Sequence, residues 1–414
     1  MSLYFHIAFS MGHIDYDFHL PKELLATEPA NPRDASRLFV YDTTTDTIQF
    51  DHFYNLDKHL PNDSTLVLNK TKVVPSRMTL QKTTGGKVVC LFLMNELYEN
   101  SKHIHVMVDR NISVGDSLLY AEPSRASKNI MTCKEHHQDS IFVFELHISR
   151  AELIALLEAH GSMPIPLYLR HTALSEKTLH ERYQTVYARN SSYASLREAH
   201  GESDEAISYI NGIATSSLKA RGLLAMTNIN SDMTTKRLFS VAAPTAGLHF
   251  TQRVFDKLQK KNIMRAEVVL EVGLGTFAPL STEALEKGKL HTEWYQVPES
   301  TRDCILSAKS EDRKIIAVGT TVVRTLESYA KLSKSEQKLS GVYHPTDIFI
   351  RGGYRFNIVD CLVTNFHLPN SSLMMLVEAF LQFKGAKRSL KELYEIAIQE
   401  KFRFYSFGDS MVIV

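Results

Sequence analysis

Cysteine is scarce in this chain of 414 residues. The four that occur are spread along the chain, and no two form a CxxC pair: Cys90, Cys133, Cys304 and Cys361. Disulfide frameworks and cysteine-ligated zinc sites both depend on closely spaced cysteines. The sequence therefore predicts neither of them, and it favours the reducing environment of the cytoplasm.

Long apolar runs and an excess of charge of one sign are also missing. No stretch reaches the length of about 18 apolar residues that a membrane-spanning helix requires, so we expect no membrane contact. The 47 Lys and Arg residues balance 46 Asp and Glu residues, for a formal net charge of +1. Since this balance provides no long-range attraction for nucleic acid, any RNA binding must depend on a local basic patch.

Several widespread catalytic motifs are absent as well. The sequence contains no GxxxxGK[ST] phosphate loop, no HExxH zinc motif and no GxSxG nucleophile elbow. His136 and His137, beside Glu135, lack the spacing of metal ligands, and we interpret them as part of a solvated turn. We therefore expect no metal dependence.

Short strand-like segments dominate the chain between residues 78 and 148. They are rich in Val, Ile, Phe and Leu, are separated by turn residues, and lie at 88–97, 103–110, 117–122 and 140–148. Several short strands at this spacing indicate a small barrel or sandwich. A helix with Ser149 as its N-cap and Gly161 at its end follows. We therefore assign residues 78–160 to an inserted β-barrel domain.

The remaining sequence alternates strands and helices. Strand-like runs lie at 38–42, 65–69, 266–273, 346–350 and 358–365, and helical ones at 322–332, 371–383 and 389–402. We therefore predict an α/β body, residues 1–77 and 161–414, with an inserted small all-β barrel domain. A polar segment at about 189–238 is interpreted as an insertion into this body.

A strand that runs into a helix offers a candidate anion site. Gly319 is followed by Thr320 and Thr321 at the start of the helix, with Arg324 one turn further along. Backbone N–H groups and hydroxyls at a helix N-terminus suit a phosphate or a carboxylate. The alternative is a plain turn in which a Thr caps the helix.

A second glycine-containing turn follows an apolar strand. Glu271, Gly273, Gly275 and Thr276 resemble the acidic and glycine-rich start of a Rossmann nucleotide site, which makes a methyltransferase an alternative. Pro279 stands where the phosphate-facing helix would have to continue, and this argues against the methyltransferase. Close approach of the backbone to some ligand is still favoured by the glycines.

Two histidines lie in turns that lead into helices. His249 follows Gly247, and His367 follows Asn365 at the end of a strand. A histidine in such a place can act as a general acid or base, although a lone buried histidine is more often a hydrogen-bonded core residue. Asn365 can both donate and accept hydrogen bonds to a base edge or an amino-acid head group.

Two further turns carry charged or aromatic side chains. Arg33, Asp34 and Arg37 form either a salt-bridged surface turn or a phosphate-binding loop. Near the C-terminus, the aromatic residues of segment 404–407 precede Asp409, a pattern that fits either core packing or base stacking.

The order of these motifs along the chain resembles that of a known family. The motifs are RDASRL (33–38), LVLNKTKVVPSRM (66–78), TGGKV (84–88), YQTVYA (183–188), AAPTAGLHFT (242–251), VGLGTFAPL (272–280), VGTTVVRTLES (318–328), VDCLVTNFHLP (359–369) and RFYSFGDSM (403–411). They are similar to the serial motifs of the S-adenosylmethionine:tRNA ribosyltransferase-isomerases of queuosine biosynthesis. The resemblance extends from Ile14 to the C-terminus, with a gap at the insertion.

The resemblance implies a particular reaction. The family transfers and isomerises the ribosyl moiety of S-adenosylmethionine, its co-substrate, onto the aminomethyl group of a deazaguanine at the wobble position of the tRNA anticodon loop. The product is epoxyqueuosine, and adenine and methionine are released. The family fold, an α/β body with an inserted β-barrel, agrees with the pattern above. The resemblance thus implies tRNA and S-adenosylmethionine as partners, and we expect a cytoplasmic monomer.

The resemblance also assigns candidate site residues. The titratable candidates for general acid and base are His249, Glu271, Glu327, His367 and Asp409. The substrate-binding candidates are Arg33, Asp34, Arg37, Asn69, Thr245, Gly247, Gly273, Gly275, Thr276, Thr320, Thr321, Arg324 and Asn365. The chemistry requires a base for the protons beside the sulfonium, a proton for the departing adenine and donors for an oxyanion. Which residue is the base and which is the acid stays open.

The sequence departs from the family pattern at a few positions. Lys70 stands where the family usually has Asp, and Glu271 where it usually has His. Residues 352–354 read Gly-Gly-Tyr instead of Pro-Gly-Tyr, and Asn370 replaces a Lys. The first change reverses a charge and the second alters proton chemistry. A repurposed or inactive relative that binds S-adenosylmethionine or RNA is therefore an alternative function.

Overall fold

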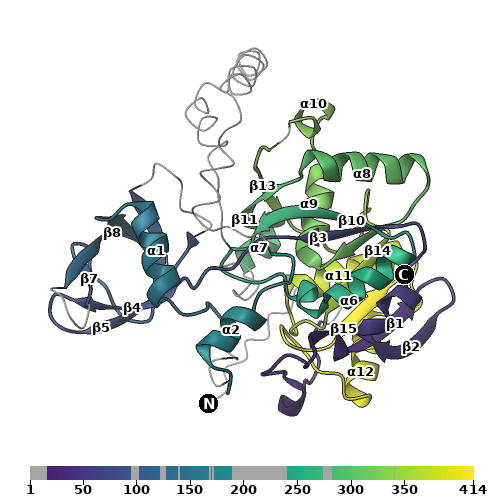
Figure 1. Ribbon diagram of the computed structural model, residues 1–414, viewed down its shortest axis with the longest axis horizontal. Helices are drawn as coiled ribbons and strands as arrows, with labels where there is room; N and C mark the ends of the chain where they lie inside the picture. The colour runs from purple at the N-terminus through teal and green to yellow at the C-terminus, as the bar shows by residue number, and fades with distance from the viewer. Residues whose placement is uncertain are drawn as a thin grey trace.

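Two structural parts make up the molecule in the computed structural model (Figure 1). The structure describes residues 16–94, 102–121, 127–138, 140–166, 169, 172–188, 240–273, 282–339 and 341–414. One part is a nine-stranded sheet covered by helices, and the other is a closed six-stranded barrel that lies to one side of the sheet. This architecture confirms the predicted α/β body with an inserted all-β barrel.

The large sheet is built mainly from parallel strands at its centre. Its order is β13 (His344–Ile348), β11 (Lys289–Gln296), β10 (Met264–Glu271), β3 (Thr65–Asn69), β12 (Ile315–Val318), β14 (Cys361–Asn365), β15 (Ser410–Ile413), β1 (Arg37–Asp42) and β2 (Thr47–His52). Strands β10, β3, β12 and β14 are parallel, whereas β15 runs antiparallel to β14 and parallel to β1. The carboxyl ends of the four parallel strands therefore share one edge with the amino ends of β15 and β1.

Helices cover both faces of this sheet. One face carries α8 (Glu299–Ser310), α9 (Thr320–Ala330), α11 (Ser372–Phe383) and α12 (Leu390–Gln399), and the other carries α6 (Gln252–Lys260) and the 3-10 helices η3 (Phe53–Lys58) and η8 (Thr245–His249). Successive strand residues point to opposite faces. Val67 accordingly packs in the core under α9, and its neighbours Leu66 and Leu68 pack in the core under α6.

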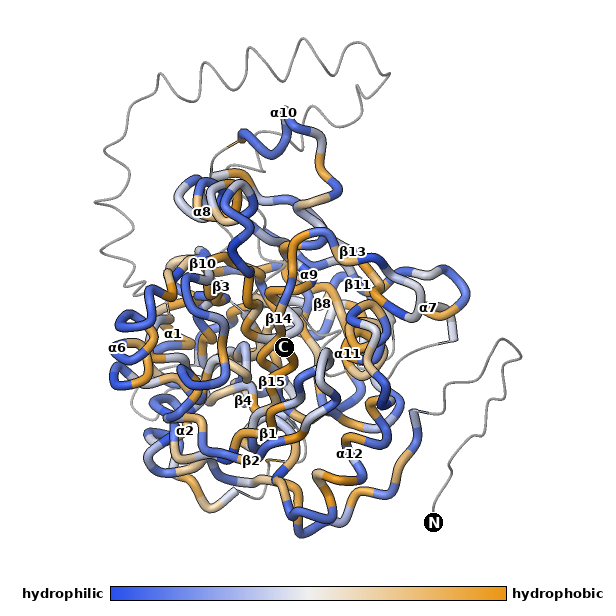
Figure 2. Tube along the Cα trace, turned by 90° about the vertical axis from the view of Figure 1, so that its right-hand side faces the viewer, coloured by the Kyte–Doolittle hydropathy of each residue, from blue (hydrophilic) through white to orange (hydrophobic). Residues whose placement is uncertain are grey.

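Hydropathy follows the same layers. In Figure 2 the hydrophobic colour is concentrated on inner strands such as β14 and β15, and the hydrophilic colour on outer elements such as α10 (Lys334–Gln337). Smaller elements connect the main ones: η1 (Lys22–Leu24), η2 (Arg33–Ala35), α2 (Glu176–Arg182) and α7 (Thr282–Lys287). Among the helices that the structure describes, none has both the length and the apolar character to cross a membrane.

The barrel closes through antiparallel pairs only. Its order is β4 (Arg77–Lys82), β5 (Lys87–Phe92), β6 (His103–Val108), β9 (Ile141–Leu146), β8 (Lys128–Gln138) and β7 (Ser117–Tyr120), and β7 pairs back to β4. Helix α1 (Arg150–His160) begins at a capping box formed by Ser149 and Glu152, which confirms the predicted N-cap. Leu153 and Leu157 of α1 pack into the barrel core.

One barrel segment differs from its prediction. His136 and His137, interpreted from the sequence as a solvated turn, lie in strand β8. Their side chains are exposed, and the His136 ring stacks on Phe142 of β9 with 4.6 Å between the ring centroids. The prediction of a turn was wrong because exposed polar residues can still belong to a paired strand, as His136 does opposite Phe142 of β9.

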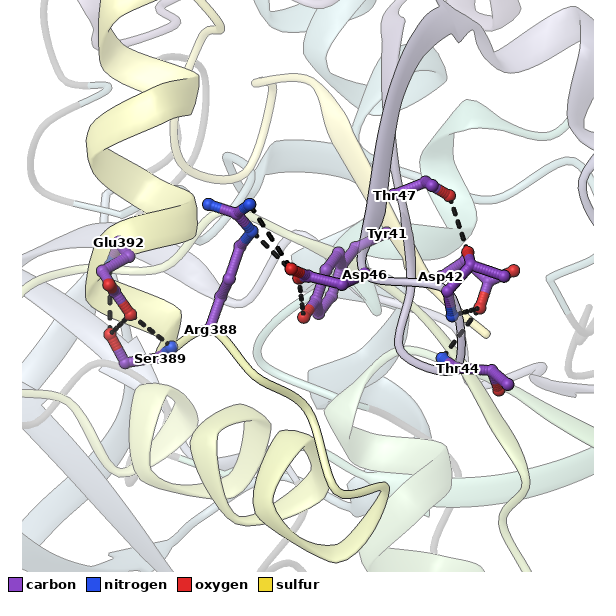
Figure 3. A network of polar contacts seen from close by, with 9 residues as sticks. Tyr41, Asp42, Thr44, Asp46, Thr47, Arg388, Ser389 and Glu392 are labelled. Carbon is purple, nitrogen blue, oxygen red and sulfur yellow. Dashed lines mark hydrogen bonds and ion pairs between the residues drawn. The ribbon is translucent and has the colours of Figure 1, made fainter.

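A polar network fixes the outer hairpin of the large sheet (Figure 3). Asp46, in the turn between β1 and β2, accepts a hydrogen bond from Tyr41 Oη at 3.0 Å and one from Arg388 Nε at 3.0 Å. Ser389 and Glu392, next along the chain, form the capping box of α12. The network therefore ties the hairpin to the start of α12, since Arg388 directly precedes the cap.

Gly161, which ends α1, provides a test of how the end of this helix packs against the segment before β4. A Cβ at this position would lie 1.9 Å from the Pro75 carbonyl oxygen and 2.5 Å from the Leu157 carbonyl oxygen, and both oxygens belong to the backbone. We expect Gly161→Ala to lower the free energy of unfolding by about 1–3 kcal/mol, as overpacking does. Gly86→Ala is the control, because a Cβ there meets nothing within 4 Å. Chemical denaturation that gives equal stabilities for the two variants would contradict this account.

Candidate functional site

Buried polar residues gather at the carboxyl edge of the parallel strands. Asn69, Glu271 and Asn365 are the last residues of β3, β10 and β14, and each is at most 2% exposed. Thr320 follows β12, and Asp409 precedes β15. Open α/β sheets bind ligands at this edge, outside the carboxyl ends of the strands. The edge is therefore the candidate site.

His249 lies at the centre of one group of these residues. It ends η8, which packs against β14 and η2, and it is 4% exposed. Its Nδ1 atom is hydrogen-bonded to Ser36 Oγ at 2.8 Å. Across the described part of the chain, neither His249 Nε2 nor the nearby Asn365 Oδ1 has a hydrogen-bond partner of good geometry. Because buried polar atoms are nearly always paired, these two atoms are candidates for ligand contacts.

Burial also sets the protonation state of this histidine. Desolvation lowers the pKa of His249 from 6.5 to about 4, although the charge of Asp409 and a contact with Asn365 favour the protonated ring. The imidazole is therefore neutral at physiological pH. A neutral imidazole has one donor and one acceptor nitrogen, and Ser36 occupies one of them.

Asp409 supports this group through the backbone. Its Oδ1 accepts the N–H of Arg37 at 3.0 Å, and its Oδ2 accepts the N–H of Arg403 at 2.8 Å. The Arg403 guanidinium also donates to Oδ1 at 3.2 Å. Both carboxylate oxygens are thus engaged, and they hold the start of β1 beside the start of β15.

A second group surrounds the end of β10. Glu271, which is 1% exposed, accepts a hydrogen bond from Thr71 Oγ1 at 2.8 Å, and Ser240 and Tyr343 hydroxyls lie 3.4 Å from its oxygens. Asn69 joins β3 to β10, because its amide donates to the Leu270 carbonyl and accepts the Leu270 N–H, both at 3.1 Å. Glu271 is thus a buried carboxylate among hydroxyl groups.

The start of α9 lies between these two groups. Gly319, with a φ of +89°, is the N-cap of α9, so the alternative in which a Thr caps this helix is wrong. A Cβ on Gly319 would lie 3.5 Å from the Ala246 Cβ, which places the helix start against η8. One turn along α9, the Nη1 atom of Arg324 forms a buried ion pair with Glu293, whose other oxygen accepts the Gly273 N–H at 3.0 Å.

Other predicted site residues make structural contacts. Glu327 accepts the N–H groups of Asn357, Ile358 and Val359 at 2.8, 3.0 and 3.2 Å, so it holds the loop before β14. His367 Nε2 is hydrogen-bonded to Thr364 Oγ1 at 2.9 Å, and burial lowers the pKa of His367 to about 4.

The charged turn of the N-terminal segment is salt-bridged. Asp34, 1% exposed, pairs with Arg253 at 2.8 Å. Arg33 donates to the Gln184 carbonyl at 2.8 Å, and Arg37 donates to the Glu400 carbonyl at 2.6 Å. These contacts support the interpretation of this segment as a salt-bridged turn over its interpretation as a phosphate-binding loop.

The remaining candidates divide between the site and places outside it. Thr245 and Gly247 belong to η8, and a Cβ on Gly247 would lie 2.0 Å from the Tyr187 hydroxyl. Gly275 and Thr276 lie outside the described residues. The substituted Lys70 forms a partly exposed ion pair with Glu267 at 3.1 Å.

Two further expectations concern aromatic residues and metals. Phe404 and Phe407 are 0% and 2% exposed, which supports core packing over base stacking for these two rings. Within the described ranges, no group of three or more His, Cys, Asp or Glu side chains is placed to hold a metal ion.

Some site residues were missed by the sequence analysis. Ser36, Ser240, Thr71 and Glu293 contact the candidate residues through single hydroxyl or carboxylate groups. Ser36 lies within the RDASRL motif and could have been noted there. Glu293 lies in a polar stretch of β11 without any recognisable pattern, and only its burial singles it out.

The chain is thus an α/β protein with an inserted barrel, and its candidate ligand site lies at the carboxyl ends of the parallel strands. The chain matches the queuosine biosynthesis protein family over residues 13–199 and 233–413, and it belongs to this family. The family resemblance is thereby confirmed.

Curated relatives agree with the family assignment. Proteins named S-adenosylmethionine:tRNA ribosyltransferase-isomerase are similar to the chain: one from Thermosipho melanesiensis is 35% identical, with 96% of this chain and 98% of its own covered. One from Trichlorobacter lovleyi is 37% identical, with 97% and 99% covered. A crystal structure of S-adenosylmethionine tRNA ribosyltransferase from Thermotoga maritima aligns with a TM-score of 0.46 and 28% identity, covering 96% of this chain and 99% of that one.

The lowered pKa of His249 predicts a pH dependence of stability. Between pH 6.5 and about 4 the unfolded chain binds a proton at this residue that the folded chain does not, so stability falls as the pH falls through this range. At pH 5 this loss amounts to about 2 kcal/mol. Urea denaturation at pH 7 and pH 5 measures this loss of unfolding free energy. The loss should be smaller in His249→Gln than in the wild type, and it should not vanish, because His367 still titrates in the variant. Equal losses would contradict the prediction.

Proposed function

We propose that this chain is an S-adenosylmethionine:tRNA ribosyltransferase-isomerase. It transfers and isomerises the ribosyl moiety of S-adenosylmethionine onto the aminomethyl-deazaguanine at the wobble position of tRNA, giving epoxyqueuosine, adenine and methionine. The observation that carries this proposal is the similarity to enzymes of that name over nearly the full length of both chains. The buried polar groups at the strand ends support it, because the reaction needs several positioned proton donors and acceptors.

The reaction defines what these groups must do. A base removes a proton from the ribose methylene beside the sulfonium. Adenine leaves with its bonding electron pair and takes up a proton. Methionine leaves when the bond between the sulfonium sulfur and the ribose carbon breaks. The tRNA amine loses a proton as it forms the new C–N bond, and an alkoxide oxygen closes the epoxide. Positioned donors stabilise such an alkoxide before closure.

His249 is the best candidate for proton transfer. Its ring is neutral at physiological pH, Ser36 orients it through Nδ1, and Nε2 is available for a ligand. Asn365 Oδ1, beside it, can accept a hydrogen bond from an exocyclic amino group of adenine or of the tRNA base. Glu271 is the second candidate, since it is a buried carboxylate at the same edge. Asp409 and Glu327 act as positioning residues, because backbone N–H groups occupy their oxygens.

The remaining features of the proposal concern organisation and partners. Residues 78–160 form a β-barrel domain inserted into a catalytic body of residues 1–77 and 161–414; the closed barrel with its own core supports this division. The tRNA anticodon loop presents the wobble base as an unstacked base that can enter the site. The protein acts as a monomer in the cytoplasm and requires no metal.

Adenine release tests the proposed reaction. Purified protein is incubated with S-adenosylmethionine and a tRNA that carries the aminomethyl-deazaguanine, and products are separated by chromatography. We expect free adenine and methionine, and none with a tRNA that has guanine at the wobble position. S-adenosylhomocysteine as the product would favour the methyltransferase. No product from folded protein, in an assay validated with an authentic relative, would favour a repurposed relative.

Substitution of His249 tests its role. We expect His249→Gln to lower kcat about a hundred- to ten-thousandfold, the range typical of a lost general acid or base. His59→Gln is the matched control, because His59 pairs with Asp51 at 2.8 Å outside the candidate site. Circular dichroism establishes that both variants fold. A kcat for His249→Gln within twofold of the wild type rules out proton transfer by this residue.

A further inference from the structure

The guanidinium of Arg324 is engaged on one side only. Its Nη1 atom pairs with Glu293, while Nε and Nη2 have no hydrogen-bond partner among the residues that the structure describes. The residue is 7% exposed, so these donors are also shielded from water. Leaving buried donors unpaired is unfavourable, and more so for charged groups. Such groups in a native protein call for a specific explanation, and a bound ligand is one.

The Nε and Nη2 atoms of Arg324 form the unpaired side of the guanidinium, and their donors have a fixed geometry. Its Nε–H and Nη2–H groups point in parallel, which is the geometry that binds the two oxygens of a carboxylate. Thr321 precedes Arg324 by three positions on α9, and residues at this spacing are neighbours on a helix surface. Within the described ranges its Oγ1 atom is also buried and unpartnered. Three unused donors thus belong to the first turns of α9, on side chains three positions apart, where the helix dipole favours an anion.

Glu293 makes this arrangement rigid. One of its oxygens pairs with Arg324, and the other accepts the Gly273 N–H at 3.0 Å. The carboxylate is 2% exposed, so both of its contacts are protected from solvent. Glu293 therefore orients the guanidinium and leaves only its Nε side for a ligand.

The location indicates which anion binds. A guanidinium that is 7% exposed lies too deep for the bulky backbone of a folded RNA, so a small anion fits it better. The start of α9 also touches η8 at Ala246, three residues before His249. The helix that carries Arg324 thus begins beside the element that carries the histidine proposed to transfer protons.

We propose that Arg324 and Thr321 bind the α-carboxylate of the methionine moiety of S-adenosylmethionine. Arg324 binds it through Nε and Nη2, Thr321 donates its hydroxyl, and Glu293 is a positioning residue. This inference rests on the proposed function, which supplies the ligand.

Decarboxylated S-adenosylmethionine, which lacks only this carboxylate, is the matching probe. Isothermal titration calorimetry measures the affinity of both compounds for the wild type, Arg324→Gln, Thr321→Val and the control Ser328→Ala. Ser328 is on the same helix, but its hydroxyl bonds to Thr346. The wild type should bind S-adenosylmethionine about ten- to a hundredfold more tightly than the decarboxylated compound, the value of a charge-assisted pair.

The variants should separate the two ligands. Arg324→Gln should lose most of the preference for S-adenosylmethionine over the decarboxylated compound. Thr321→Val should reduce this preference about three- to tenfold, and Ser328→Ala should leave it unchanged. The affinity for the decarboxylated compound should stay within twofold of the wild type in all three variants. Equal affinities of the wild type for both compounds, or equal losses for both in Arg324→Gln, would overturn the carboxylate site and leave the proposed function standing. No binding of either compound, together with no adenine release, would overturn both.

A double variant and an RNA-binding measurement cover the remaining outcomes. If Arg324→Gln does not fold because it leaves Glu293 buried and unpaired, Glu293→Gln/Arg324→Gln removes both charges, and Thr321→Val decides independently. Binding of the tRNA anticodon stem-loop is measured by filter retention in the same variants. Weakened RNA binding with unchanged S-adenosylmethionine affinity would assign these donors to an RNA phosphate and overturn the proposal.

Discussion

The parallel alignment of four strands that end at one edge is the constraint on which the site depends. The hydrogen-bonded register pairs Val268 with Asn69 and Val318 with Val363, so the polar residues at the ends of these strands lie along one edge of the sheet. The antiparallel strand β15 then brings Ser410 opposite Asn365, with Asp409 beside it. A slip of one residue in any of these pairs would turn the side chains to the other face.

The polar residues at this edge follow two different patterns of hydrogen bonding. Glu327 and Asp409 are fully engaged, largely by backbone N–H groups, and so they fix loops and strand starts. His249 is anchored by Ser36 and contacts Asn365 without a well-aligned hydrogen bond. Arg324 is anchored by Glu293, and its other donors are unpaired among the described residues. The first pattern stabilises the framework, and the second leaves oriented groups for a ligand.

Much of the framework could be predicted from local patterns. The apolar run 65–69 and the Ser149 cap lie where the sequence indicated them, because strand burial and capping depend on a few neighbouring residues. Strand β8 was partly misjudged, since its exposed half carries charged and His side chains that resemble a turn. Hydrophobicity identifies a strand only where one of its faces is buried.

By itself the sequence determined the family, through the order of its motifs, and the presence of an α/β body with an inserted barrel. Tertiary structure alone decided the partners of the candidate residues. Ser36 is hydrogen-bonded to His249, which lies 213 positions further along the chain, and Glu293 of β11 pairs with Arg324 of α9. Local periodicity cannot encode such pairs, because they form only after distant strands have docked in register and excluded water. That exclusion also lowers the pKa of His249, so its chemistry belongs to the fold and not to its motif.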